Sequence, residues 1–206
     1  MKVLLINGSP HVAGCTNRGL LEVEKELRAE NVSTEIWQLG TKVVAGCRGC
    51  GYCRQNPKCV IDDIVNEFAE AAIAADGFVF GTPVHYAAAG GTIASFMDRV
   101  FYSQSVNLAY KPATAIVSCR RGGASAAFDQ LNKYFAINNM PIVSSQYWNM
   151  IHGNTPEEVE KDLEGLQTMR VLGRNMAWLL KSIEAGKNAG VEMPAKEERA
   201  RTNFIR

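Results

Sequence analysis

The start of the chain combines a buried strand with a loop of glycine, serine and threonine. Residues 3–6 form an apolar run that ends before Gly8, which predicts a strand. The loop continues to Gly14, and a helix is expected from Thr16, with Thr16 or Asn17 as its N-cap. Backbone N–H groups at such a junction point at one spot and favour an anion. The stretch therefore predicts a phosphate site.

The spacing within this loop indicates which phosphate it could hold. Gly8 and Gly14 do not fit the dinucleotide pattern G-x-G-x-x-G. Cys15 stands where a nucleoside-triphosphate loop has its lysine, and the gap between the glycines is one residue too long. Hydroxyls and amides alone can hold a terminal monophosphate, which is the expected ligand. The alternative is an ordinary strand-to-helix turn without a ligand.

A second group of chemically active residues is a compact run of cysteines. The pattern is C-x2-C-x2-C-x5-C, formed by Cys47, Cys50, Cys53 and Cys59. Structural zinc more often uses two CxxC pairs with a longer spacer, and a thioredoxin-type pair needs no third or fourth cysteine. An iron–sulfur cluster, zinc and free thiols all stay open here. Cys15 and Cys119 are not expected to be ligands.

Other catalytic patterns are missing from the sequence. No cysteine has an arginine six positions later, which excludes tyrosine-phosphatase chemistry, and no G-x-S-x-G occurs. His11, His85 and His152 have no evident nucleophile beside them. No side chain is therefore assigned as a general acid or base. Asp98-Arg99 is interpreted as a structural ion pair or cap.

Composition narrows the class of protein. The chain has 206 residues, 47% of them hydrophobic, and a net charge of +1. This charge predicts no nucleic-acid or membrane partner, and no signal peptide or membrane helix is expected. A cytoplasmic location follows as an expectation. In that compartment, six cysteines favour metal or redox chemistry over disulfides.

Strands and helices are expected to alternate. Strand patterns lie at residues 3–6, 33–39, 77–81, 112–118 and 140–150, the last one broken near its middle. Helical patterns lie at residues 16–30, 62–75, 91–101, 124–137 and 156–186, the last one capped by Thr155. The alternation predicts an α/β fold, a flavodoxin-like three-layer sandwich with a five-stranded parallel sheet in the order 2-1-3-4-5. One domain over residues 1–187 and a tail over 188–206 are expected, with the motif loops at the carboxyl ends of the strands.

Four short motifs then occur in order along the chain. They are Asn7-Gly-Ser-Pro10, Gly14-Cys-Thr-Asn17, Gly81-Thr-Pro-Val-His-Tyr86 and Phe96-Met-Asp-Arg99. In this combination the chain resembles the NAD(P)H-dependent FMN reductases and multimeric flavodoxins, to about residue 185. The resemblance implies a flavodoxin-like fold, bound FMN, electron transfer from NAD(P)H, and a homodimer or homotetramer.

The resemblance also implies roles for individual residues. Ser9, Thr16 and Asn17 would hold the FMN phosphate, and Pro10 would shape the loop beside them. The flavin ring and ribityl chain would be lined by Pro83, Val84, His85 and Tyr86. The pyrimidine side would meet Cys119, Arg120, Arg121, Gly122 and Gly123. Donors there would stabilise negative charge on the reduced ring and so tune its potential.

The cysteine loop resembles the iron–sulfur flavoproteins, a branch of the same family. This implies a [4Fe-4S] cluster on Cys47, Cys50, Cys53 and Cys59 that passes single electrons to FMN. Many relatives keep a G-C-x-x-C segment without a cluster, so zinc and free thiols stay open.

The expected activity is an FMN-dependent NAD(P)H oxidoreductase. A nicotinamide would give its hydride to the flavin, and a quinone, a flavin or another acceptor would take the electrons. The alternative is a flavodoxin-like electron carrier that serves a ferredoxin-like protein and has no small-molecule substrate.

Overall fold

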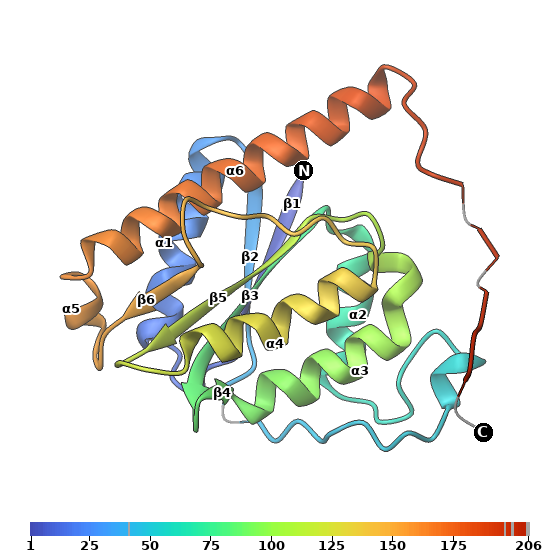
Figure 1. Ribbon diagram of the computed structural model, residues 1–206, viewed down its shortest axis with the longest axis horizontal. Coiled ribbons are helices and arrows are strands. Elements are labelled where there is room, and N and C mark those ends of the chain that lie inside the picture. The colour runs from blue at the N-terminus through green and yellow to red at the C-terminus, as the bar shows by residue number, and fades with distance from the viewer. Residues whose placement is uncertain (41, 196, 199, 205–206) are drawn as a thin grey trace.

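The sheet of this protein has five parallel strands and one short antiparallel strand. The computed structural model describes residues 1–206 except 41, 196, 199, 205 and 206. The sheet order is β2-β1-β3-β5-β6, and Figure 1 shows its arrangement. The strands are β1 (Lys2–Asn7), β2 (Ser33–Gln38), β3 (Gly77–His85), β5 (Ala113–Cys119) and β6 (Met150–His152). The predicted order is confirmed, since the short β4 (Ala88–Ala89), which pairs antiparallel with β3, only changes the numbering.

Helices cover both faces of the sheet. One face packs against α1 (Cys15–Ala29) and α6 (Leu163–Asn188). The other packs against α2 (Ile64–Ala74), α3 (Gly91–Leu108) and α4 (Ala124–Ile137). The three-layer α/β sandwich is therefore confirmed (Figure 1).

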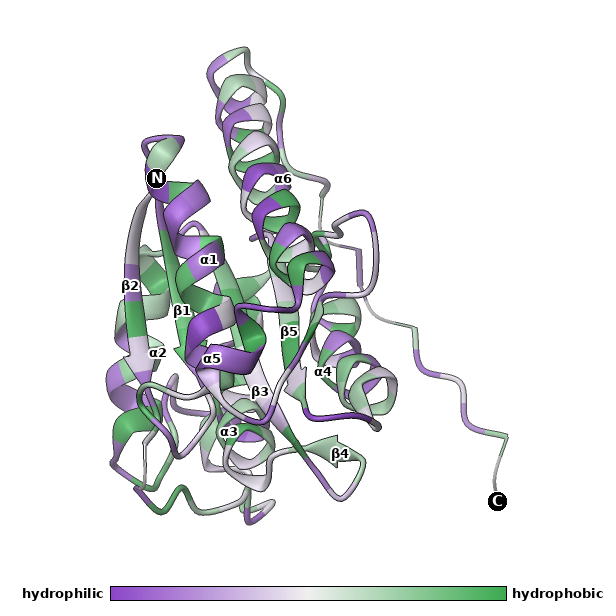
Figure 2. Ribbon diagram, turned by 90° about the vertical axis from the view of Figure 1, so that its left-hand side faces the viewer, coloured by the Kyte–Doolittle hydropathy of each residue, from purple (hydrophilic) through white to green (hydrophobic). Residues whose placement is uncertain are grey.

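The central strands β1, β3 and β5 are largely apolar on both sides because both faces of the sheet are covered. Leu4 and Phe80 belong to the core beneath α2–α4, whereas Leu5 and Val79 belong to the core beneath α1 and α6, and all four are 0% exposed. In Figure 2, β1 and β5 are green along most of their length. Side chains of a strand alternate between faces, so one apolar run supplies both cores.

The structure corrects the ends of several predicted elements. β3 continues past Gly81 to His85, and α3 continues to Leu108. The last strand is β6, which begins only at Met150, while Ile142 makes an isolated bridge to Ala113. Tertiary pairing with β4 and β5 extends β3, which local pattern does not reveal.

The predicted long final helix is in fact two helices. Thr155 caps α5 (Pro156–Val159) by accepting from Glu158 N, as predicted. α6 then starts anew after Asp162, whose carboxylate accepts from Gly165 N at 2.9 Å and from His152 N at 2.6 Å. The side chain of Asp162 thus ties the helix start to β6. In the described residues, no helix is long and apolar enough to cross a membrane.

Candidate functional site

The loop after β1 is held from two strands. Asn7 is 0% exposed, and its Oδ1 accepts from Ser9 N at 3.1 Å. Its Nδ2 donates to Gln38 Oε1 at 2.6 Å, and Gln38 Nε2 donates to Ser9 O at 2.8 Å. Gly8 N donates to Gly81 O of β3 at 2.9 Å. Asn7 was noted only as part of a motif and Gln38 not at all, although an Asn two residues before a loop N–H is a usual turn signal.

The helix after this loop starts with open backbone donors. Gly14 is the N-cap of α1, and no side chain of the described residues caps it. The prediction of Thr16 or Asn17 as N-cap is wrong, because Gly14 is extended and its carbonyl already accepts from Arg18 N at 3.0 Å. The first-turn N–H groups therefore lack a side-chain acceptor, which suits an anion.

Two predicted hydroxyls lie at this helix start. Ser9 is 4% exposed, and its Oγ accepts from His11 N at 3.1 Å. Thr16 is 1% exposed, and its Oγ1 lies 2.7 Å from Ser118 Oγ on β5. Ser118 was missed because a serine inside an apolar strand gives no local signal. The pair links the start of α1 to the end of β5.

The loops after β3 and β5 meet each other. Tyr86 and Ala87 form the turn between β3 and β4 with φ of 48° and 59°, the left-handed pattern that tight hairpins require. Gly123 has φ of +91°, and a Cβ there would lie 2.6 Å from Ala87 Cα and 2.8 Å from Val84 Cγ1. The structure thereby brings the predicted residues 83–86 and 119–123 together. Tyr86, at the hairpin tip, is fully exposed.

The remaining predicted residues of this edge differ in burial. Cys119 is buried, and burial raises the pKa of its thiol despite hydrogen bonds from the backbone of Arg121 and Ala124. Arg120, Arg121 and His85 are exposed. Their charged or polar ends are therefore accessible at the carboxyl edge of the sheet.

All four cysteines of the second motif line one cavity. It has a volume of about 410 Å³ and lies between the loop after β2 and α3, which contributes Asp98, Arg99 and Tyr102. Every cysteine of the chain is a free thiol. The pKa of Cys53 is raised by burial and by the charges of the other three cysteines in the loop, so the sulfur of Cys53 lies within electrostatic reach of the other three.

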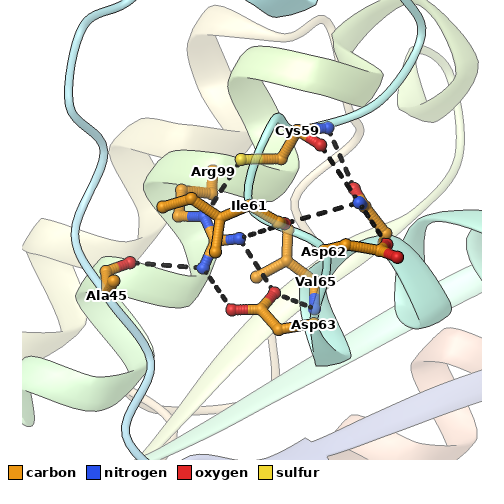
Figure 3. Close-up of polar contacts among 8 residues, drawn as sticks. Ala45, Cys59, Ile61, Asp62, Asp63, Val65 and Arg99 are labelled. Carbon is orange, nitrogen blue, oxygen red and sulfur yellow. Dashed lines mark hydrogen bonds and ion pairs between the residues drawn. The ribbon is translucent and has the colours of Figure 1, made fainter.

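One end of this cysteine loop is held by a buried arginine (Figure 3). Arg99 Nη1 and Nη2 donate to the two carboxylate oxygens of Asp63 at 2.7 and 2.8 Å, and Nε donates to Cys59 Sγ at 3.2 Å. Burial alone would raise the pKa of Asp63, but hydrogen bonds from Arg99 and Val65 N lower it overall. The predicted structural role of Arg99 is confirmed, but its partner is Asp63; Asp98 accepts from Tyr134 instead.

Comparison with known proteins decides the family. The profile of the NADPH-dependent FMN reductase family matches residues 1–155. The chain belongs to this family. An iron–sulfur flavoprotein of Methanocaldococcus jannaschii is 30% identical over 195 residues, which covers 89% of this chain and 100% of the relative. One of Methanosarcina thermophila is 28% identical, covering 91% of this chain and 100% of the relative.

Solved structures agree with the fold of the family. A flavone reductase superposes with a TM-score of 0.71 at 17% identity, covering 89% of this chain and 64% of that one. An NADH:FMN oxidoreductase superposes with a TM-score of 0.62 at 15% identity, covering 88% and 89%. This FMN reductase family member belongs to the iron–sulfur flavoprotein branch. As a member of that family, it is an FMN-binding oxidoreductase.

The cysteine cavity fits an iron–sulfur cluster by its donor set. Four free thiols line it together, and four cysteine thiolates are the usual ligand set of such clusters. Among the described residues, no three His, Cys, Asp or Glu side chains form a ready-made metal site. The number and chemistry of the donors match the group, and Cys59 is the ligand candidate that the surrounding protein holds most firmly.

Proposed function

We propose that this protein passes electrons from NAD(P)H through FMN, bound at the carboxyl edge of β1, β3 and β5, to a quinone, a flavin or another acceptor. The observation that carries the proposal is the uncapped start of α1 beside the joined loops 83–87 and 119–123. The first feature suits a phosphate, and the second would give a flavin ring attached to that phosphate two neighbouring loops to contact. We further propose a cytoplasmic location and a homodimer or homotetramer.

Each part of this edge has its own task. The first-turn amides of α1 with Ser9, Thr16 and Asn17 bind the phosphate, and Pro10 shapes the loop. Residues 83–86 orient the ring, and residues 119–123 offer backbone and guanidinium donors to its pyrimidine side. Bound FMN would accept the hydride of the nicotinamide and supply the redox chemistry. We propose no side chain as a proton donor or acceptor in the reaction.

A second candidate is favoured by the charge around the cysteine cavity. Between Glu35 and Asp62 the chain has four basic residues and no acidic one. These residues, all exposed, are Lys42, Arg48, Arg54 and Lys58. Such a surface is complementary to an acidic, ferredoxin-like carrier. In this second candidate function, a [4Fe-4S] cluster would relay single electrons between FMN and that carrier, and the protein would have no small-molecule substrate.

Anaerobic stopped-flow mixing separates the two candidates. We expect NADPH or NADH to bleach the flavin absorbance near ~450 nm, since hydride transfer removes the oxidised ring. If neither nucleotide bleaches the flavin while dithionite does, the reductase proposal is wrong. Bleaching only by a reduced ferredoxin, slower at high salt, would identify the carrier.

The phosphate site makes a separate prediction. Replacing Ser9 by Ala or Thr16 by Val removes a hydroxyl from the proposed site, and a hydrogen bond to a charged group contributes about 1.5–3 kcal/mol. We expect FMN affinity to fall about 10- to 150-fold, measured by fluorescence titration. Riboflavin, which lacks the phosphate, is the control ligand, and its affinity should stay the same. If the variants lose the same affinity for riboflavin as for FMN, the assignment of Ser9 and Thr16 to the phosphate is wrong.

A further inference from the structure

Arg99 is a buried cation whose contacts converge on the cysteine loop. Its side chain is 1% exposed. Nη1 also donates to Ala45 O at 3.3 Å, and Nη2 donates to Ile61 O at 2.8 Å. Figure 3 shows these bonds reaching the loop from both of its ends. The guanidinium therefore holds together the start and the end of the cysteine-bearing segment.

The contact with sulfur is separate from the ion pair. Asp63 takes the two terminal nitrogens of Arg99 in a bidentate pair, which is the arrangement that stabilises a buried guanidinium. Nε is not part of that pair, and it points at Cys59 Sγ at 3.2 Å. A structural ion pair alone would not need this third bond.

The backbone of Cys59 is fixed as well. Cys59 N donates to Asn66 Oδ1 at 2.9 Å, and Asn66 Nδ2 donates to Cys59 O at 3.1 Å. Asn66 is 7% exposed on α2. By contrast, Cys47 and Cys50 are exposed. The cavity is thus asymmetric, with one sulfur held in place by α2 and α3 and others at the surface.

We propose that Arg99 is a positioning residue that orients the sulfur of Cys59 and stabilises the reduced state of the cluster bound there. This inference rests on the cluster of the proposed function. Reduction by one electron adds one negative charge, and hydrogen bonds to ligand sulfurs favour the more negative state and raise the potential. Arginine stays protonated throughout, so no proton accompanies the electron at this residue.

Arg99→Lys tests the contact, because lysine keeps the charge beside Asp63 but has no guanidinium Nε–H for the sulfur. The matched control is Gln104→Met. Gln104 is 3% exposed on the same helix and donates to Pro57 O of the same loop at 2.7 Å, without touching sulfur. If Arg99 only holds the loop in shape, loss of either contact with the loop should shift the midpoint of the cluster in the same way.

The experiment is a redox titration of the anaerobically reconstituted full chain, followed by EPR of the reduced cluster. At the wild-type midpoint, we expect the reduced-to-oxidised ratio of Arg99→Lys to fall about tenfold, which is 59 mV for a one-electron couple. Gln104→Met should keep the wild-type midpoint. The inference about Arg99 is wrong if all three proteins have the same midpoint, or if both variants shift by the same amount. Neither result would contradict the presence of the cluster.

Asp63→Asn supplies a second measurement if Arg99→Lys does not fold. Asparagine still caps α2, and it leaves the charge of Arg99 uncompensated, so the midpoint should rise. An unchanged or lowered midpoint in Asp63→Asn counts against the inference. A wild-type chain that takes up FMN but no iron and sulfide overturns both the inference and the proposed cluster.

Discussion

Replacing Cys47 or Cys50 by Ser is expected to remove the iron and sulfide of the protein and to leave FMN bound. Both thiols line the cavity that holds all four cysteines, and a cluster needs its full set of thiolates. As far as the chain is described, the lining of this cavity contains none of the residues expected at the flavin. Loss of the cluster should therefore leave the flavin site intact. Iron, sulfide and flavin analysis of each purified variant measures this.

Cys15→Ser is the control for this prediction. Cys15 is the first residue of α1, and its Sγ contacts Gly153 O at 3.6 Å, outside the cysteine cavity. We expect this variant to keep iron, sulfide and FMN. The proposed separation of cluster and flavin sites is wrong if Cys47→Ser retains as much iron and sulfide as Cys15→Ser, or if Cys47→Ser loses FMN as well.

Replacing Gly123 by Ala is expected to disrupt the flavin site through its backbone. A left-handed φ disfavours any residue with a Cβ by about 1–2 kcal/mol. The new Cβ would also lie 2.6 Å from Ala87 Cα, a backbone atom that can move only with the hairpin. Overpacking of this kind destabilises a fold by about 1–3 kcal/mol, and displacement of residues 83–87 should weaken FMN binding about tenfold or more. Urea unfolding and FMN titration measure the two effects.

Gly122→Ala is the matched control. A Cβ at Gly122 would meet no described atom within 4 Å. This neighbouring substitution should leave stability near the wild-type value. If Gly123→Ala binds FMN as well as the wild-type chain does, the hairpin and the loop 119–123 do not form the site together.

The layer architecture could be read from the sequence because it depends on local patterns. Apolar runs and turn residues gave the order of elements, and α4 has the predicted bounds. The break before α6 could not be predicted, because Asp162 caps α6 and also accepts from His152 N of β6, a contact with a separate element. The extension of β3 past Pro83 likewise depends on pairing with β4 and β5.

In the candidate site too, contacts between distant segments could not be predicted from the sequence. The roles of Ser9 and Gly123 at the flavin were predicted from the resemblance to the family, and the order of the strands predicted that their loops lie at one edge of the sheet. The residues that hold these loops were missed or given the wrong partner. Arg99 contacts Cys59 and Asp63, which are 40 and 36 positions away in the chain. Such contacts arise only from packing between α2 and α3, which a single sequence does not show.

One chain is proposed to bind FMN at the sheet edge and an iron–sulfur cluster at the cysteine cavity. Anaerobic purification followed by flavin, iron, sulfide and zinc analysis of the same sample measures both groups together. We expect about one FMN per chain with about four iron and four sulfide, and no zinc. Zinc or metal-free thiols in the cavity would contradict the cluster, and a protein without flavin would contradict the proposed function as a whole.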